Sequence, residues 1–316
     1  QSRDVISKWI REMLNNGFIR PSNSSFRSPL LVTAKLTSDG KVKGWRVCFD
    51  ARRINAKTKA YPGNPPPSSE QIFNDLGGAK MFSTTDFKSG FYNVTMTDRG
   101  AAITAFADPN DGRLFEHARM PMGLVGSPAT FAKLGALVFH ELLSMCMQLY
   151  VDDLVIYTND KHIKEAKQRW IKAKEDDFIS THNQPLLSSV KRKKRSSLPG
   201  EKAPSVLAVH TQQLEAVFQR CAKAGLLCAL KKTHVGQPKV ALLGHEVSTE
   251  GLKPCPLKTA AMRLAPSPED VTGVRRALGA FGFYRRFIPH FTEGTIEMRK
   301  MLKKGVKFGW TDQMEL

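Results

Sequence analysis

The chain has 316 residues, carries 48 Lys+Arg against 29 Asp+Glu, and has a formal net charge of +19. This length is enough for about two domains of roughly 150 residues each. An apolar share of 41% with 23 glycines excludes a wholly disordered or collagen-like chain. Five cysteines, without a Cys-x-x-Cys pair, argue against a disulfide framework and a zinc site and favour a reducing compartment. No stretch approaches the roughly 20 apolar residues of a membrane span, and because the chain begins at Gln1 we expect a fragment of a longer protein.

The positive charge is concentrated in the second half. Residues 1–160 carry 19 basic and 15 acidic side chains, whereas residues 161–316 carry 29 and 14. Such an asymmetry predicts a polyanion held mainly by the second half. A basic surface without a partner is the alternative.

In chain order, the first half predicts a mixture of helices and strands. Apolar residues from Val5 to Leu14 recur at helical spacing, and a half-buried hairpin is expected from Leu30 to Phe49. A short helix follows, opened by a capping box at Ser68 and Gln71 and ended by Gly77-Gly78. We further expect strands at 82–86, 102–106 and 114–118, a helix from Ser127 to about Ser144, and a strand, tight turn and strand over 147–157.

The second half divides into a polar stretch and an ordered remainder. Residues 161–208 are polar, basic and almost without periodicity, which favours an insertion or linker that is mostly disordered. Order is expected to resume with a helix through Leu214, Val217 and Phe218, then a hairpin over 239–247 and helices at about 256–263 and 268–280. Strands and helices do not alternate regularly, so the predicted class is α+β.

Three carboxylates are the candidates for chemistry. Asp152 and Asp153 interrupt an otherwise apolar hairpin, and Asp86 ends another apolar strand. Unpaired charge is costly in such surroundings, and carboxylates that converge repel one another unless a cation lies between them. Oxygen ligands of this kind suit Mg²⁺. A solvated turn, where Asp is common, is the alternative.

At this point the sequence resembles a known family. Its ordered motifs are similar to those of the reverse transcriptase domain of gypsy-type long-terminal-repeat retrotransposons, and more distantly to the retroviral enzymes. The motifs are Trp45 to Asn55, Leu76 to Gly90, Met120 to Phe131, Tyr150 to Asp153, Leu242 to His245, Phe283 to Pro289 and Lys307 to Thr311. The resemblance implies a right-hand polymerase fold with fingers, an antiparallel palm sheet and a thumb.

The resemblance also implies roles for individual residues. Asp86, Asp152 and Asp153 would hold two Mg²⁺ ions, which Mn²⁺ could replace, one at the primer 3′-hydroxyl and one at the triphosphate. Lys35 and Arg46 would neutralise the triphosphate, or be solvated strand residues. Phe91 would pack beneath the ribose, with Tyr92 or neither ring as the alternative, and Lys232 would be a general acid for pyrophosphate or merely solvated. Gly123 would let the backbone approach the nucleotide, and Met122 stands where retroviral enzymes often have Gln. Leu243, Gly244 and His245 would form a primer grip. Within it, His245 would contact the primer phosphate or have no ligand role.

The predicted organisation follows. Residues 1–85 would form the fingers and the start of the palm, 86–160 the palm and fingers with the catalytic motifs, 161–208 the insertion, 209–251 a palm helix and the primer grip, and 252–316 the thumb and connection toward an RNase H domain absent from this chain. The insertion is either a tolerated surface addition or translated intron sequence.

The predicted function is RNA-directed and DNA-directed DNA synthesis on a primed RNA or DNA template with dNTPs, without a membrane. The alternatives are a catalytically inactive, domesticated nucleic-acid-binding protein and an RNA-dependent RNA polymerase, whose third motif usually carries Gly-Asp-Asp. We expect an intracellular location, in a cytoplasmic particle or the nucleus, and Lys191 to Arg195 is a candidate nuclear localisation patch.

Overall fold

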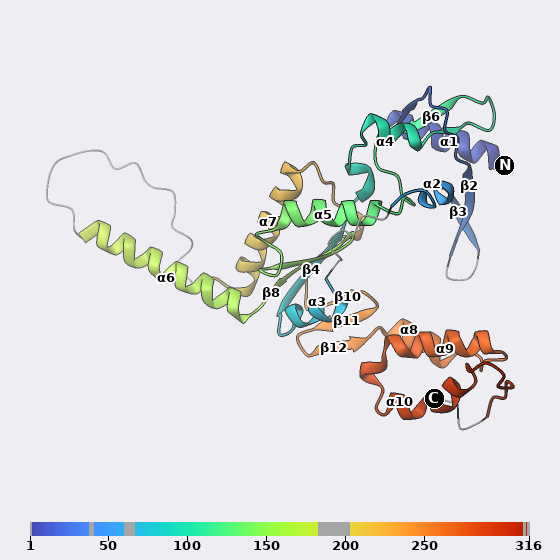
Figure 1. Cartoon of the computed structure of the whole chain (residues 1–316). Helices are drawn as coiled ribbons and strands as arrows, with labels where there is room; N and C mark the ends of the chain where they lie inside the picture. Colours follow the sequence, from blue (N-terminus) through green and yellow to red (C-terminus); the bar gives the residue numbers. More distant parts are fainter. Residues whose placement is uncertain (1, 38–40, 60–66, 183–202, 312–313, 315–316) are drawn as a thin grey trace.

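A four-stranded antiparallel sheet in the order β7-β8-β4-β9 lies at the centre of the molecule (Figure 1). The computed structural model describes residues 2–37, 41–59, 67–182, 203–311 and 314. The sheet consists of β4 (Met81–Asp86), β7 (Met147–Tyr150), β8 (Asp153–Thr158) and β9 (His234–Gln237). It corresponds to the predicted palm.

Both faces of this sheet are covered. Leu154 and Ile156 of β8 are buried in one hydrophobic core, and Val155 and Tyr157 in another. Because successive strand residues point to opposite faces, an uninterrupted apolar strand needs cover on both sides. One face carries α5 (Ser127–Phe139) and α7 (Val206–Lys223); the other carries α3 (Ser69–Leu76) and the sheet of β10 (Lys239–Leu242), β11 (His245–Ser248) and β12 (Gly251–Pro254).

A buried histidine fastens α7 to the central sheet. His210 is fully buried, with Nε2 2.7 Å from the Ser83 hydroxyl of β4 and Nδ1 2.8 Å from the Thr158 hydroxyl of β8. The Thr158 hydroxyl donates to the Gln213 side chain, so it accepts a hydrogen bond from Nδ1–H and leaves Nε2 to accept from Ser83. Burial lowers the pKa of His210 to about 4, and the ring is therefore neutral at pH 7.

The regions predicted to be the fingers and the thumb, which keep those names below, have separate cores. In the fingers, Ile6, Ile10 and Met13 of α1 pack against Phe49 and Phe106. In the thumb, Val274, Met298 and Met301 form a smaller core. The fingers contain α1 (Ser2–Asn15), the hairpin β2 (Leu30–Leu36) and β3 (Val42–Phe49), α2 (Arg52–Asn55), α4 (Asp98–Ile103) and the sheet of β1 (Ile19–Pro21), β6 (Leu114–His117) and β5 (Phe106–Ala107). The thumb contains α8 (Pro256–Arg263), α9 (Val271–Phe283), η3 (Arg285–Phe287), α10 (Phe291–Gly294) and α11 (Ile296–Lys300).

The strand expected at 102–106 is wrong for most of its length. The chain forms α4 over Asp98–Ile103, and the following strand is only Phe106–Ala107. The Thr97 hydroxyl accepts a hydrogen bond from the Gly100 amide at 3.2 Å, and this N-cap, with Asp98 in the first turn, starts a helix. The helix expected to reach Ser144 also ends earlier, at Phe139.

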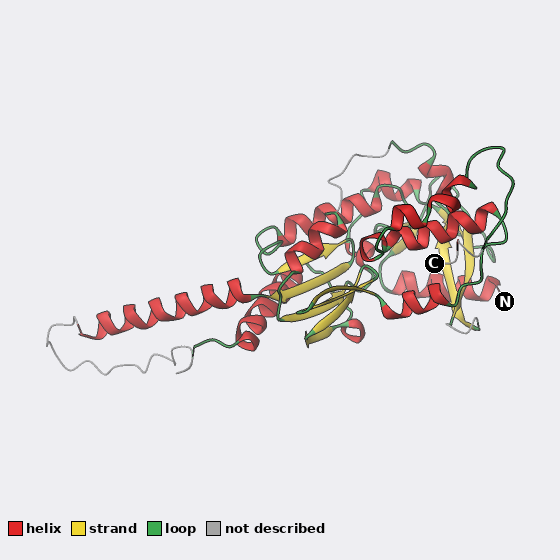
Figure 2. Ribbon diagram, turned by 90° about the horizontal axis from the view of Figure 1, so that it is seen from below, coloured by secondary structure: helices red, strands yellow, loops and turns green. Residues whose placement is uncertain are grey.

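The disorder expected across 161–208 is likewise contradicted over its first half. Helix α6 (Asp160–His182) begins directly after β8 and projects away from the body (Figures 1 and 2). It holds no Gly or Pro and is rich in Lys, Glu, Ala and Gln, which favour helix without tertiary support. Asp160 in its first turn pairs with Lys80 at 2.6 Å. Residues 183–202, including the run Lys191 to Arg195, lie outside the described residues, and α7 begins at Val206.

No helix among the described residues is both long and apolar enough to span a membrane.

Candidate active site

The three predicted acids meet at one end of the central sheet. Asp86 is the last residue of β4 and Asp153 the first of β8, and the two are direct partners in the antiparallel register. Asp152 lies in the turn between β7 and β8. The side chain of Asp86 remains 27% exposed, and Asp152 is exposed. The sheet therefore presents carboxylates from two motifs, 66 residues apart, to solvent at one end of its two central strands. This end, with Asp86, Asp152 and Asp153, is called the acidic edge below.

Lys232 is the cationic partner of this acidic edge. It lies in η2 (Leu230–Lys232), and its Nζ is 2.5 Å from Asp86 Oδ2. The hydrogen bond with Asp86, its charge and the charges of Asp152 and Asp153 raise the pKa of Lys232. An ammonium with a raised pKa keeps its proton at neutral pH. The structure thus brings the predicted general acid to the acids, although 146 residues separate it from Asp86.

Asp153 is partly buried and lies beside the two other carboxylates. Burial, followed by the charges of Asp152 and Asp86, raises the pKa of Asp153, against the opposing influence of Lys232. Within the described residues, no three His, Cys, Asp or Glu side chains are grouped so as to hold a metal ion. The donor set nevertheless fits a hard divalent cation, because carboxylate oxygens are its preferred ligands and its charge would offset the repulsion at Asp153.

The turn that presents Asp152 is strained. Val151 has φ +57°, a left-handed conformation that is a genuine outlier for a β-branched residue. The apolar strands on either side, buried on both faces, hold it there. Strain of this kind concentrates at functional sites.

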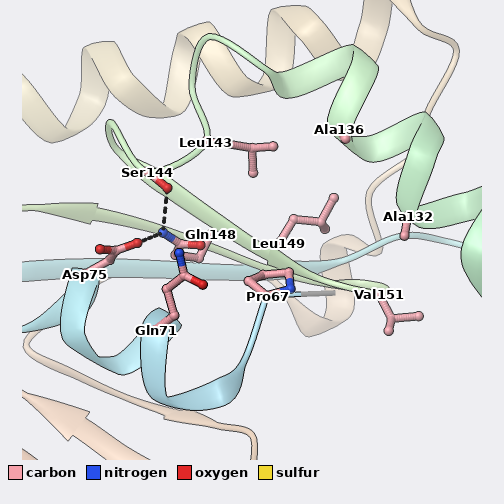
Figure 3. A pocket seen from close by; sticks show the side chains of 10 residues that line it. All are labelled: Pro67, Gln71, Asp75, Ala132, Ala136, Leu143, Ser144, Gln148, Leu149 and Val151. Carbon is pink, nitrogen blue, oxygen red and sulfur yellow. Dashed lines mark hydrogen bonds between the residues drawn. The ribbon is translucent and has the colours of Figure 1, made fainter. Parts of the chain in front are cut away.

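A cavity of about 230 Å³ lies behind this turn (Figure 3). Gln148 Nε2 donates to Asp75 Oδ2 at 2.6 Å and to Ser144 Oγ at 3.5 Å across it. Val151 lines the cavity, whereas none of the three predicted acids does. The cavity is therefore separate from the acidic edge.

A second loop is held in place by a residue whose role the sequence did not reveal. Asn55 of α2 donates from Nδ2 to the Gly123 carbonyl at 2.8 Å and accepts from the Val125 amide at 2.9 Å. Gly123 has φ +100°, which any other residue would adopt only with strain. Met122 is 55% exposed beside it. Asn55 belongs to the motif that ends the fingers hairpin, but nothing in the sequence pairs it with a loop 68 residues away.

The two candidate sugar contacts occupy different environments. Phe91 is half-buried against Phe131, with ring centroids 5.4 Å apart. Tyr92 stacks on Phe18 at 4.7 Å within the fingers core, and burial raises its pKa to about 12. The structure disfavours the alternative that assigned the sugar to Tyr92. The sugar contact of Phe91 stays a prediction.

Lys35 and Arg46 lie together on the fingers hairpin. Lys35 is opposite Gly44, and Arg46 is opposite Thr33, so both side chains project from the same face of β2 and β3. Both are exposed. Their shared face is compatible with triphosphate binding, and their role stays a prediction.

The predicted primer grip is a tight hairpin whose histidine points inward. Leu243 and Gly244 have φ +46° and +77° and form the turn between β10 and β11. His245 is only 4% exposed, and its Nδ1 is 3.1 Å from the Leu243 carbonyl. Its ring is surrounded by four aromatic rings, those of Phe73, Phe283, Tyr284 and Phe287. The geometry favours a structural role for His245 over the predicted phosphate contact, and the primer-grip role of Leu243 and Gly244 stays a prediction.

Solved structures establish the fold. A foamy viral protease-reverse transcriptase in complex with double-stranded DNA superimposes with a TM-score of 0.73 at 23% identity, over 98% of this chain and 45% of that one. The foamy viral protein in complex with an RNA/DNA hybrid gives 0.69 at 22% identity, over 99% and 35%. The chain therefore has the right-hand polymerase fold.

Sequence comparison then shows which known proteins the chain is similar to. Residues 35–180 match the profile of the family "Reverse transcriptase (RNA-dependent DNA polymerase)". The chain is 28% identical over 303 residues to the Drosophila melanogaster Pol polyprotein of transposon 297, and 28% identical over 290 residues to that of transposon gypsy. These matches cover 96% and 91% of the chain but only 24% and 23% of the polyproteins. Residues 35–180 are thus similar to the reverse transcriptase family, and the chain as a whole is similar to part of retrotransposon Pol polyproteins, in agreement with the resemblance of the motifs.

Proposed function

We propose that this chain is an RNA-directed and DNA-directed DNA polymerase that joins deoxynucleotides to a primer 3′-hydroxyl. The observation that carries the proposal is the convergence of Asp86, Asp152 and Asp153 at one exposed sheet edge, with the Lys232 ammonium on Asp86. The polymerase fold and the family match support it. The chain spans about a quarter of the length of these polyproteins.

The acids would hold divalent metal, Mg²⁺ or Mn²⁺. When bound, such ions lower the pKa of the primer hydroxyl and stabilise charge on the transferred phosphoryl group. Asp86 and Asp153, which are direct register partners on two strands, would hold that charge, and Asp152 would add a third ligand from the turn. Lys232, which holds a proton at Nζ, would donate it to the departing pyrophosphate.

The template and primer would be held chiefly through phosphates. The region 203–316 carries 17 basic against 9 acidic residues, and lysine and arginine contacts to phosphate release counterions. Foamy viral relatives have been solved with double-stranded DNA and with an RNA/DNA hybrid, which supports the same ligand class for this chain. An intracellular location, in a cytoplasmic particle or the nucleus, is part of the proposal and follows from the retrotransposon type.

The test is primer extension on poly-rA/oligo-dT and on a DNA template with Mg²⁺ or Mn²⁺. Wild type should extend both, and Asp86→Asn should abolish extension while the primer-template still binds. Asp160→Asn is the matched control, because this exposed acid lies at the far end of β8 and pairs only with Lys80 among the contacts of the described chain. Wild type that binds primer-template with steep salt dependence but extends nothing with either metal would instead identify a domesticated nucleic-acid-binding protein.

A further inference from the structure

Two thiols lie next to each other beside the acidic edge. The Sγ atoms of Cys221 and Cys228 are 3.9 Å apart and share a hydrogen bond. A disulfide has an S–S length of about 2.05 Å, so the sulfurs need to approach by about 1.9 Å. Both cysteines are free in this structure, and the other three, Cys48, Cys146 and Cys255, have no hydrogen bond to another sulfur within the described chain.

The end of helix α7 determines how the chain returns toward Cys221. Helix α7 ends in a Schellman motif: the Leu226 amide donates to the Cys221 carbonyl at 2.9 Å, and the Gly225 amide to Ala222 at 3.2 Å. Gly225 takes the left-handed conformation, with φ +68°, that this motif requires. The chain therefore turns back sharply just after Cys221 and returns alongside it.

The position of Cys228 is fixed by backbone contacts with the end of strand β4. Cys228 is the bridge partner of Phe87. On either side of this bridge, the Lys88 amide donates to the Leu227 carbonyl at 2.7 Å and the Ala229 amide to the Asp86 carbonyl at 2.8 Å. Cys228 thus belongs to the segment that holds the backbone of Asp86 and leads into η2 with Lys232.

We propose that Cys221 and Cys228 are a modification site at which a peroxide forms a reversible intramolecular disulfide. Cys228 is half-buried and Cys221 is 3% exposed, so the peroxide reaches Cys228 first. The Cys228 thiolate attacks one peroxide oxygen and becomes a sulfenic acid, and the other oxygen leaves as water. Cys221 sulfur then attacks the Cys228 sulfur and expels a second water, so that two thiols and one hydrogen peroxide give one disulfide and two waters.

The alternative is that the two thiols are only small apolar groups. Cys221 is buried in the core shared by α5, α7 and the sheet, and Cys228 packs against that core. Free cysteines often serve in this way. A pair that merely fills space would oxidise no faster than any other two cysteines of the chain, and this difference can be measured.

The experiment is a thiol count and disulfide map of the native chain treated with hydrogen peroxide. We expect the number of free thiols to fall by two per chain, a single Cys221–Cys228 linkage by mass spectrometry, and full recovery with dithiothreitol. Linkage should form at least tenfold faster in the folded chain than in urea. Cys255→Ser should retain the linkage, whereas Cys228→Ser should lose it.

The proposal does not depend on polymerase activity, so it can fail or succeed independently of the proposed function. Wild type that keeps all five thiols under peroxide, that links other cysteines, or that forms the linkage no faster when folded would overturn it. If Cys228→Ser fails to fold, the wild-type map and the Cys255→Ser control still decide the outcome.

Discussion

Two hairpins with tight turns stand in contrast. The hairpin of β7 and β8 places Val151 in the left-handed region and presents Asp152 to solvent, while that of β10 and β11 places Leu243 and Gly244 there and buries His245. The β7–β8 hairpin holds carboxylates that repel one another at the acidic edge. The β10–β11 hairpin buries a neutral imidazole among aromatic rings. We infer that the first is built for chemistry at a cost in stability, and the second for stability where palm and thumb meet.

The largest expected effect is on chemistry at the acidic hairpin. Asp152→Asn should lower the rate of primer extension by about 10³-fold or more, since it removes charge that acts in the transition state. His245→Phe should leave the rate within about threefold of wild type, since the ring does not reach substrate. Single-turnover extension under saturating primer-template measures both. A large loss in His245→Phe would break the contrast.

The next effect is on stability at the histidine hairpin. His245→Ala should lower the free energy of unfolding by about 3 kcal/mol, because it leaves a cavity among four rings. His245→Phe should cost far less, since it keeps a ring and removes a buried Nε2 that has no hydrogen-bond partner within the described chain. Urea unfolding of the two variants provides the comparison. Equal losses would show that the imidazole, and not its ring shape, is required.

A smaller effect on the free energy of unfolding is expected from relieving the backbone strain of the two turns. Val151→Gly should raise the free energy of unfolding by up to about 1 kcal/mol. The left-handed backbone costs an L-residue about 1–2 kcal/mol, and the larger conformational entropy that glycine loses on folding offsets part of the gain. The same change should slow extension, since the flexible turn no longer fixes Asp152. Leu243→Gly is the matched variant. Because Leu243 also packs against the core of α3 and the sheets, we expect the lost apolar contacts to cancel the gain in stability, with little change in rate. Thermal unfolding and extension assays on both variants test this.

The pH dependence of stability should have opposite signs at the two hairpins. The folded-state pKa of Asp153 is raised, so its ionised form destabilises the fold and stability improves as the pH falls through that pKa. The folded-state pKa of His245 is lowered by burial and by Arg286 and Lys258, so stability declines as the pH falls below 6.5. Unfolding with EDTA present, between pH 7.5 and 4.5, should show a flatter profile in His245→Phe. Asp153→Asn should be more stable than wild type at pH 7.5, and a loss there would contradict the assignment.

Local signals in the sequence were sufficient for the elements that carry the acids. The Ser68 cap is confirmed by the hydrogen bond from the Gln71 amide at 3.2 Å, and the apolar runs ending at Asp86 and beginning at Asp153 form the expected paired strands. The helix over 98–103 was missed because a short capped turn competes with an apolar run that also suits a strand. Helix α6 was missed because its polar composition resembles that of a linker.

Contacts between distant residues could not be predicted. Lys232 and Asp86, Asn55 and Gly123, and the rings around His245 meet only through tertiary packing. The two cysteines are a different case, since seven residues separate them and only the Schellman motif, which a single glycine marks, turns the chain back far enough to bring their sulfurs together.

The buried His210 has a consequence for how the protein can be made. Because hydrogen bonds to Ser83 and Thr158 and a shared apolar core attach α7 to the sheet, its docking does not require the peptide chain that joins it to α6. Fragments 1–182 and 203–316, expressed as separate polypeptides, should therefore assemble into one particle that copurifies through a tag on either piece. His210→Ala in the second fragment should weaken that complementation, which would make the two-piece protein a direct assay for the strength of this attachment.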